Sequence, residues 1–260
     1  MFNLSNKEIL ITGATGYLGS AMVRALCRQG ATVYVNSRCE KKASLLVNEM
    51  IAQGFKAKPA VFNVNSEASI NDWLAVERLT KLNAVINNAY SGASGTIETS
   101  QEHEFRDSFE VTVIAAQRLF TKLLPVFRST VKSGELVSIV NVCSMYGFVS
   151  PDISLYDMKS VANPPFYGAS KAALHQWSVY GACEFSSEGI RFNSLSPGPF
   201  PNKDVQKNAP DFIAKLSNKV PMKRIGQSQE ICGPIVFLVA DESSFVNGTN
   251  LEVNGGWTSW

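Results

Sequence analysis

Tyr167 and Lys171 lie four positions apart, a spacing that suits proton transfer. In a helix this separation puts both side chains on one face. A tyrosine hydroxyl has a pKa near 10, and a neighbouring ammonium group would favour the phenolate and lower that pKa by about 1–3 units. The pair therefore predicts general acid/base chemistry near neutral pH. Alone such a pair is more typical of an ordinary helix surface, so its context decides.

A glycine-rich turn, TGATGYLG, occupies residues 12–19. Glycine lets the backbone approach a pyrophosphate, and a following helix would supply free N–H groups and a partial positive charge. A tight strand-to-helix turn without a ligand is the alternative. Its position in the first strand–helix–strand unit favours a dinucleotide. The expected contacts are Gly13, Thr15, Gly16, Tyr17, Leu18 and Gly19.

The residues about twenty positions further on indicate which dinucleotide is bound. NAD-binding proteins usually carry an acid there, to bond the ribose 2′-OH. This chain has Asn36, Ser37 and Arg38 instead. With no carboxylate and with an arginine to pair with a 2′-phosphate, we expect NADP(H) to be preferred, contacted by Ser37 and Arg38, with NAD(H) as the alternative cofactor. The other interpretation is that Arg38 is merely solvated.

These residues need elements that bring them together. Short apolar segments alternate with helical stretches, which predicts a Rossmann-type, doubly wound α/β fold: a mostly parallel seven-stranded sheet with helices on both faces. Ligands of such sheets bind beyond the carboxyl ends of the strands. The expected strands are Glu8–Thr12, Thr32–Asn36, Ala57–Asn63, Asn83–Asn87, Leu136–Val142, Ile190–Leu195 and Asn250–Val253, and the expected helices include Tyr17–Arg28, Glu40–Gln53, Glu102–Phe127 and Tyr167–Ser187.

Further motifs follow the later strands in order. They are Asn87-Asn88-Ala89, Ser144, the YxxxK pattern from Tyr167 to Lys171, Ser196-Pro197-Gly198 and Asn254-Gly255-Gly256. Together with the glycine turn they make the chain resemble the compact one-domain branch of the short-chain dehydrogenase/reductase family over essentially its whole length. The resemblance implies one domain over residues 1–260 that interconverts a carbonyl and an alcohol by hydride transfer with a nicotinamide dinucleotide.

The resemblance also implies roles for single residues. Tyr167 would donate a proton to a carbonyl oxygen or take one from an alcohol. Ser144 would hydrogen-bond that oxygen, and Lys171 would also hold the nicotinamide ribose. Additional cofactor contacts are implied at Asn63, Val64, Asn88, Ala89, Pro197, Gly198 and Phe200, beside Tyr167 and Lys171 themselves.

Four positions depart from the family pattern. Tyr17 replaces a glycine of the first turn, Asn63 an aspartate near the adenine, and Tyr90 the glycine that ends the Asn-Asn-Ala-Gly turn. Thr112 stands where the family usually has a catalytic asparagine. Because a threonine cannot reproduce the contacts of an amide, the usual water-linked proton relay through Lys171 is in doubt, although we expect turnover from Ser144, Tyr167 and Lys171.

The substrate is less determined. An insert at residues 148–165 and a lid at residues 200–224 are expected over the substrate pocket. The carboxylates, amides and aromatic rings of the insert suit a sugar or sugar derivative, and the chain also resembles bacterial reductases of surface-polysaccharide and flagellin-sugar biosynthesis. A 3-oxoacyl or a polyol/gluconate-type substrate is the enzymatic alternative. A non-catalytic NADP-binding regulatory or scaffold protein is the alternative of another class, and an oligomer-contact or solvated loop is the alternative for the insert.

The composition excludes several other classes. A net charge of +2 over 260 residues indicates neither a nucleic-acid nor a membrane partner, and no membrane-spanning stretch or signal peptide is expected. Five dispersed cysteines suit a reducing, cytoplasmic setting. His103 and His175 have no convincing partners for a metal site. By analogy with the family, a homodimer or homotetramer is expected.

Overall fold

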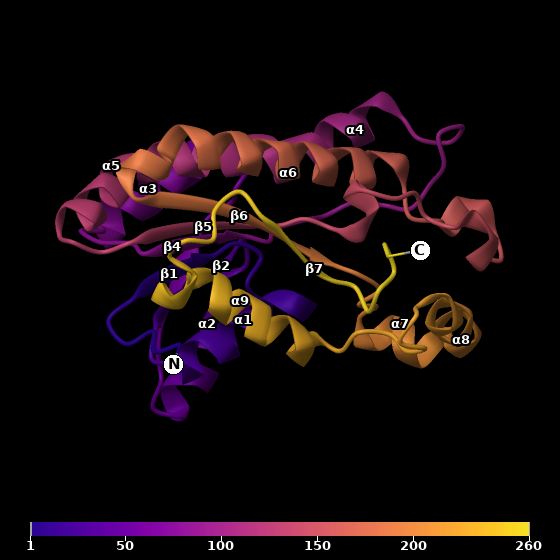
Figure 1. The fold of residues 1–260 in the computed structure, drawn as a ribbon, viewed down its shortest axis with the longest axis horizontal. Coiled ribbons are helices and arrows are strands. Elements are labelled where there is room, and N and C mark those ends of the chain that lie inside the picture. The colour runs from indigo at the N-terminus through magenta and orange to yellow at the C-terminus, as the bar shows by residue number, and fades with distance from the viewer. Residues whose placement is uncertain (1, 260) are drawn as a thin grey trace.

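The computed structural model describes residues 2–259; Met1 and Trp260, the end residues of the expected domain, lie outside the described residues. Seven strands form one sheet in the order β3-β2-β1-β4-β5-β6-β7, and every neighbouring pair is parallel. The predicted fold class is therefore confirmed (Figure 1). The strands are β1 (Glu8–Ile11), β2 (Thr32–Ser37), β3 (Lys56–Val61), β4 (Ala84–Asn87), β5 (Val137–Val142), β6 (Ile190–Pro197) and β7 (Asn250–Val253).

Burial along the strands explains their apolar sequences. Every residue of β4, β5 and β6 is buried, because helices cover both faces of the central strands. The edge strand β3 is different: four of its six residues are exposed, and it carries Pro59, which an edge position tolerates.

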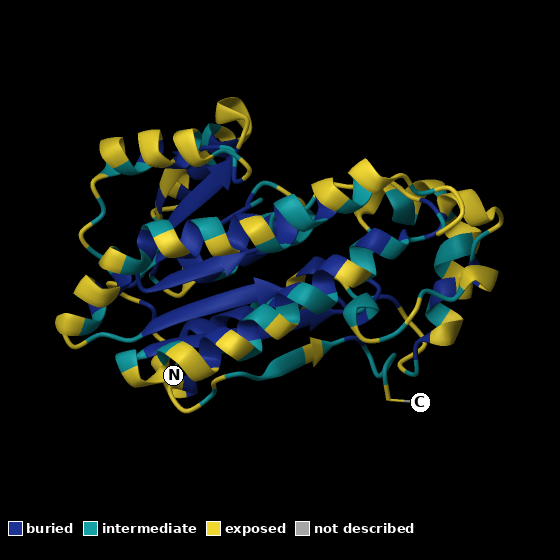
Figure 2. Cartoon of the chain, turned by 90° about the horizontal axis from the view of Figure 1, so that it is seen from above, coloured by how far each residue is buried: buried dark blue, intermediate teal, exposed yellow. Residues whose placement is uncertain are grey.

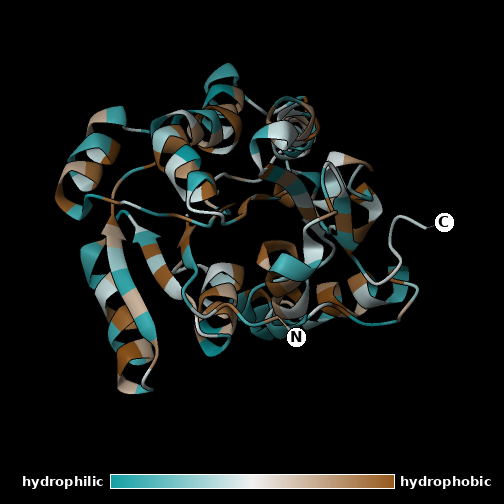
Figure 3. Ribbon diagram, turned by 60° about the vertical axis from the view of Figure 1, so that its left-hand side comes forward, coloured by the Kyte–Doolittle hydropathy of each residue, from teal (hydrophilic) through white to brown (hydrophobic). Residues whose placement is uncertain are grey.

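Helices pack on the two faces of the sheet in separate groups (Figures 1 and 3). One apolar cluster joins one face to Met22, Leu46 and Ile235. A second cluster joins the other face to Leu119 and neighbouring helices. The first group is α1 (Tyr17–Arg28), α2 (Glu40–Ala52) and α9 (Cys232–Val239); the second comprises α3 (Glu67–Glu77), α4 (Glu102–Phe109), α5 (Ala115–Lys132) and α6 (Pro165–Phe185).

The expected helix Glu102–Phe127 is not a single α-helix. A π-helical turn, Glu110–Ile114, separates α4 from α5, and α5 continues to Lys132. A π turn adds a residue to the helical repeat, which apolar periodicity does not reveal, and such turns are frequent at functional sites. Thr112 lies at its centre.

The lid and the insert lie together at the end of the molecule that is on the right in Figure 1 and, after the turn about the horizontal axis, on the right in Figure 2. The lid contains α7 (Lys203–Asn208) and α8 (Pro210–Lys219), and the insert contains the 3₁₀ turns Ile153–Leu155 and Lys159–Val161. Neither lid helix was among those expected from the sequence.

The sheet register brings the predicted motifs to one level. Ile11 at the end of β1 pairs with Val35 of β2 and with Ile86 of β4. The glycine turn, the Asn36–Arg38 segment and the Asn87–Ala89 turn therefore leave the same edge of the sheet.

Candidate active site

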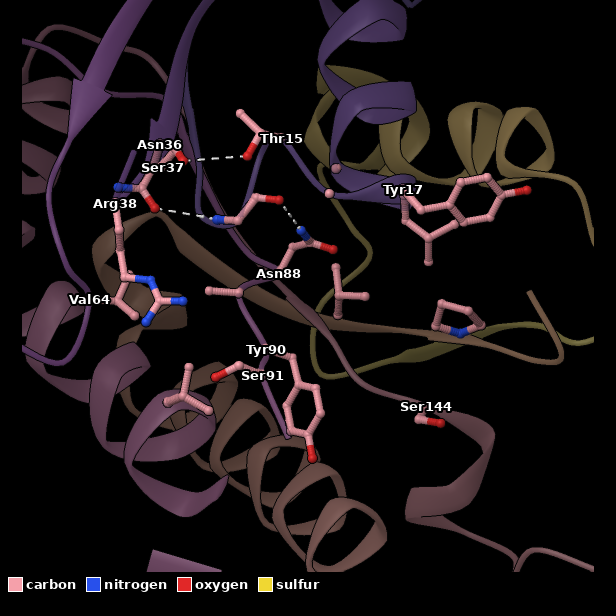
Figure 4. Close-up of a pocket in the computed structure, with 18 of the residues that line it drawn as sticks. Thr15, Tyr17, Asn36, Ser37, Arg38, Val64, Asn88, Tyr90, Ser91 and Ser144 are labelled. Atoms are coloured by element: carbon pink, nitrogen blue, oxygen red, sulfur yellow. Dashed lines mark hydrogen bonds between the residues drawn. The ribbon is translucent and has the colours of Figure 1, made fainter. Parts of the chain in front are cut away.

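A cleft of about 490 Å³ opens at the carboxyl ends of β1, β2, β4 and β5 (Figure 4). The structure brings together in its wall every residue that the sequence assigned to the cofactor, and Ser144 as well. Its wall also includes residues that the sequence reasoning missed, namely Asn36, Cys39, Lys42, Asn65, Tyr90, Ser91, Val111, Val142 and Cys143.

Two asparagine side chains, the buried Asn36 and the half-buried Asn88, hold the glycine turn in place (Figure 4). The amide of Asn36 accepts from Gly13 N at 3.3 Å and donates to the carbonyl oxygens of Ala60 and Phe62. Asn88 Nδ2 donates to the carbonyl oxygens of Thr12 and Gly13 at 3.0 and 3.1 Å. Asn36 is therefore a support for the turn, and the absence of an acid at this position reflects that task as well as the choice of cofactor.

The three glycines of the turn are required for different reasons. A Cβ at Gly19 would lie 2.4 Å from Gly13 O, and a Cβ at Gly13 would lie 2.8 Å from Ala89 Cα. The fold itself thus requires these two. A Cβ at Gly16 would meet only Gly13 O, at 3.3 Å, which a small shift relieves. A ligand that approaches the backbone closely is the better explanation for glycine at position 16.

The start of α1 suits an anion. Its N-cap, Gly16, has no side chain to satisfy the first N–H groups, and the first turn contains no acid. Uncapped N–H groups and the positive end of the helix dipole therefore line the cleft. A pyrophosphate fits these residues.

Two cations lie beyond β2. Arg38 and Lys42 both line the cleft, both are exposed, and no ion pair to either is found among residues 2–259. Lys42 was missed; its place in the first turn of α2, just after the end of β2, is the signal that would have found it. This pair of cations can neutralise a phosphate at the ribose end of the cleft.

A second pocket of about 350 Å³ adjoins the cleft. Four residues belong to both walls: Ser144, Tyr167, Gly198 and Phe200. The remainder of the second wall comes from the insert, the lid and the loops after β4, β5 and β6. Its residues are Ala93, Ser94, Met145, Tyr146, Tyr156, Val161, Ala162, Asn163, Pro164, Pro199, Pro201, Val205, Phe212 and Leu216. Ser144 and Tyr167 thus stand where the two spaces meet.

Tyr167 and Lys171 share one face of α6, but their electrostatics differ from the sequence prediction. Lys171 is buried, and its Nζ donates to Val142 O at 2.7 Å. Burial lowers the pKa of Lys171 to about 8. Burial raises the pKa of Tyr167 to about 12, and the Ser144 hydroxyl offsets only part of that rise. The predicted lowering of the tyrosine pKa was wrong, because desolvation of the buried phenol is the largest effect on it.

Tyr90, one of the departures from the family pattern, packs against both residues. Its ring lies edge-on to that of Tyr167, with 4.7 Å between centroids, and Lys171 Nζ lies 5.5 Å from its centroid. The Tyr90 ring therefore contributes to the packing that buries Tyr167 and Lys171.

Thr112 does not line the main cleft. It is buried, and its Oγ1 has no hydrogen-bond partner among the described residues. It borders a separate cavity of about 10 Å³, beside Thr12 and Asn87. That volume is about the minimum for one water molecule, and two polar neighbours are about the minimum number of partners. The threonine is therefore directed to a different space from that of Lys171.

The insert and the lid pack on each other, and together we call them the cap (residues 148–165 and 200–224). Leu155 and Leu216 form a small apolar core, and the rings of Tyr156 and Phe212 lie 5.3 Å apart. Ion pairs join Asp157 to Lys215 at 2.6 Å and Asp152 to Lys219 at 2.7 Å. The ion pair with Lys219 lowers the pKa of Asp152 to about 2.

The other sequence candidates carry no chemistry in residues 2–259. His175 Nδ1 lies 3.1 Å from Ser194 Oγ and its ring packs on Phe148. All five cysteines are unpaired. Over the described part of the chain, no cluster of histidine, cysteine or acidic residues suits a metal ion, and no helix is long and apolar enough to cross a membrane.

Comparisons with known proteins agree with this geometry. A family model described as enoyl-(acyl carrier protein) reductase matches residues 13–258. Gluconate 5-dehydrogenase of Gluconobacter oxydans is 30% identical, over 99% of this chain and 97% of that protein. A-factor type gamma-butyrolactone 1′-reductase (1S-forming) of Streptomyces virginiae is 32% identical, over 98% and 96%. The crystal structure of a gluconate 5-dehydrogenase from Burkholderia cenocepacia, in complex with NADP and tartrate, matches 100% of this chain and 98% of its own with a TM-score of 0.86 at 27% identity.

Proposed function

The chain belongs to the short-chain dehydrogenase/reductase family and is an oxidoreductase of alcohol and carbonyl groups, and from this premise we propose that it uses NADPH to reduce a carbonyl group of a sugar or sugar derivative. One observation carries the proposal: Ser144 and Tyr167 belong to the walls of both the glycine-turn cleft and the pocket under the cap. A molecule in each space would meet at these two hydroxyl groups.

The proposed cofactor fits the residues of the cleft. The start of α1 with Gly16 would hold the pyrophosphate, Arg38 and Lys42 the 2′-phosphate, and Lys171 the nicotinamide ribose. When bound, NADPH supplies the hydride. The Burkholderia relative, solved with NADP, supports this choice.

Tyr167 would act as the proton donor. With its pKa raised to about 12, the hydroxyl stays protonated at neutral pH. The alkoxide that forms on reduction is more basic than a phenolate, so transfer from Tyr167 to that oxygen is downhill. Ser144 would hold the same oxygen in place. Lys171, fixed to Val142 O, would favour the transient phenolate through its charge.

The pocket wall favours a hydroxylated substrate. Asn163 lies in this wall, and its Oδ1 is buried with no donor among the described residues. A substrate hydroxyl would supply that donor, and leaving a buried acceptor unpaired costs about 1–3 kcal/mol. The rings of Tyr146, Tyr156 and Phe212 offer apolar faces beside it. We further propose a role in surface-polysaccharide or flagellin-sugar biosynthesis, on the sequence resemblance given above.

A gluconate-type reaction is the second candidate, favoured by the similarity to the gluconate 5-dehydrogenases of Gluconobacter and Burkholderia. A 3-oxoacyl thioester is less suited, because its chain has no hydroxyl groups to donate to Asn163. The non-catalytic alternative is disfavoured because a binding protein has no need for Ser144, Tyr167 and Lys171 at one junction.

Three further parts of the proposal concern the whole molecule. Residues 1–260 would form one domain whose cap covers the substrate. Unpaired cysteines support a cytoplasmic setting, and the family resemblance supports a homodimer or homotetramer.

The test is NADPH consumption by the purified protein with keto-sugars, keto-aldonates and a 3-oxoacyl thioester at equal concentration. The proposal expects the highest kcat/KM with a keto-sugar or keto-aldonate. A clear preference for the thioester would reject it.

A further inference from the structure

The pocket under the cap has a wall without charge. Its polar groups are the hydroxyls of Ser94, Ser144, Tyr146, Tyr156 and Tyr167 and the amide of Asn163. No aspartate, glutamate, lysine, arginine or histidine is among the described residues that line it. Burial raises the pKa of Tyr146 further above its usual value, so that hydroxyl is neutral too. An ion in this pocket would find hydrogen bonds but no counter-charge.

Three cations of the cap are neutralised by ion pairs, and the exposed Lys159, Lys203 and Lys207 are not among the residues that line the pocket. Lys215 and Lys219 lie on α8 beside Phe212 and Leu216, which do line the pocket, but each is paired with an aspartate of the insert. Arg224 at the end of the lid is paired with Glu230 at 2.7 Å. Recruiting one of these cations for a substrate would break the ion pair in which it already takes part.

The balance between charge and hydroxyl groups follows from these contacts. A carboxylate or phosphate that leaves water for an uncharged wall loses its hydration without gaining a counter-ion, and that loss exceeds what neutral hydroxyl donors return. A sugar hydroxyl exchanges its water for groups such as the Asn163 amide at little net change. The same wall therefore accepts one class of substrate and rejects the other.

We propose that the pocket selects a substrate with no ionised group near the reacting carbonyl, such as a keto-sugar, in preference to a keto acid such as a keto-aldonate. This inference rests on the proposed function, because it concerns the same reaction at Tyr167. It separates this protein from its gluconate-oxidising relative and allies it with the lactone reductase, whose named substrate class is uncharged.

The direct experiment measures kcat/KM for a pair of substrates that differ chiefly in charge, 5-keto-D-fructose and 5-keto-D-gluconate, with NADPH at saturation. We expect the uncharged member to be favoured by roughly 100-fold or more. Equal rates, or a preference for the keto acid, would overturn the inference and leave the proposed function intact. If the protein consumes no NADPH with either member of the pair or with any other keto-sugar, the proposed function and the inference are both overturned.

A pair of variants tests whether the missing charge in the pocket wall causes this substrate preference. Val161 lines the pocket and is 48% exposed, so a longer side chain can be accommodated there. Val161→Lys adds the missing counter-charge, and Val161→Gln adds similar length without charge. We expect the lysine variant to raise the ratio of kcat/KM for the keto acid to that for the keto-sugar by roughly tenfold, and the glutamine variant to leave the ratio unchanged. An equal shift in both variants, or in neither, would show that pocket charge does not set the preference.

Discussion

Replacing Arg38 by alanine should separate the two nicotinamide cofactors. Arg38 lines the cleft at the end of β2, is exposed, and has no ion pair to another described residue. Its guanidinium is therefore available to a 2′-phosphate, and its removal should cost little in folding. A charge-assisted hydrogen bond contributes about 1.5–3 kcal/mol, so NADPH affinity should fall about 10–150-fold, while NADH affinity, which has no such contact, should change less than about twofold.

The assay is fluorescence titration of each purified variant with NADPH and with NADH at fixed ionic strength. Lys132→Ala, at the exposed end of α5, is the matched control for losing one positive charge. Lys42→Ala should give a smaller loss for NADPH in the same direction, because an ammonium acts as a single point charge. If Arg38→Ala weakens NADPH and NADH equally, or neither of them, the assignment of the phosphate site is wrong.

Three other perturbations follow from the geometry. Gly19→Ala should unfold the glycine turn, because its Cβ would lie 2.4 Å from Gly13 O. Gly16→Ala should keep the melting temperature within a few degrees and weaken NADPH binding. Equal melting temperatures for the two variants would contradict this. Lys171 has a pKa of about 8 in the folded protein and about 10.5 in the unfolded chain, so the unfolded chain binds more protons between these pH values. The free energy of unfolding should therefore rise with pH across that window, by up to ~3 kcal/mol relative to the profile of Lys171→Met. Parallel profiles of the two proteins in urea titrations would reject the burial argument. Leu216→Ala opens the small core of the cap and should raise KM at least tenfold in steady-state assays. Asp157→Asn breaks an ion pair whose side chains are 46% and 83% exposed and should change KM less than twofold. The reverse order would show that the ion pair holds the cap closed.

Local sequence patterns were sufficient to predict the strands of the sheet and most of the residues that line the cleft. Each central strand is buried on both faces, so its apolar run is visible in the sequence, and the ligand-facing turns follow the strands in order. The helices that were not expected have weaker patterns. α9 is apolar around its whole circumference, and α7 is only six residues long.

The remaining features depend on long-range packing, which local sequence patterns do not contain. The pKa of Tyr167 depends mainly on how much protein surrounds it, which is not visible from a four-residue spacing. The π turn around Thr112 and the unpaired oxygen of Asn163 are likewise properties of the assembled site. The ion pairs of Lys215 and Lys219 join them to residues some 60 positions earlier, which the sequence alone does not reveal.

The central claim, proton donation by Tyr167 at the junction of the two pockets, is tested most directly by Tyr167→Phe. NADPH affinity from fluorescence titration and kcat with the best keto-sugar would be measured on the same preparations. The account predicts a loss in kcat of about 10²–10⁴-fold, with NADPH affinity changed less than about threefold, because the phenyl ring keeps the packing against Tyr90. A variant that retains most of its kcat would contradict the account.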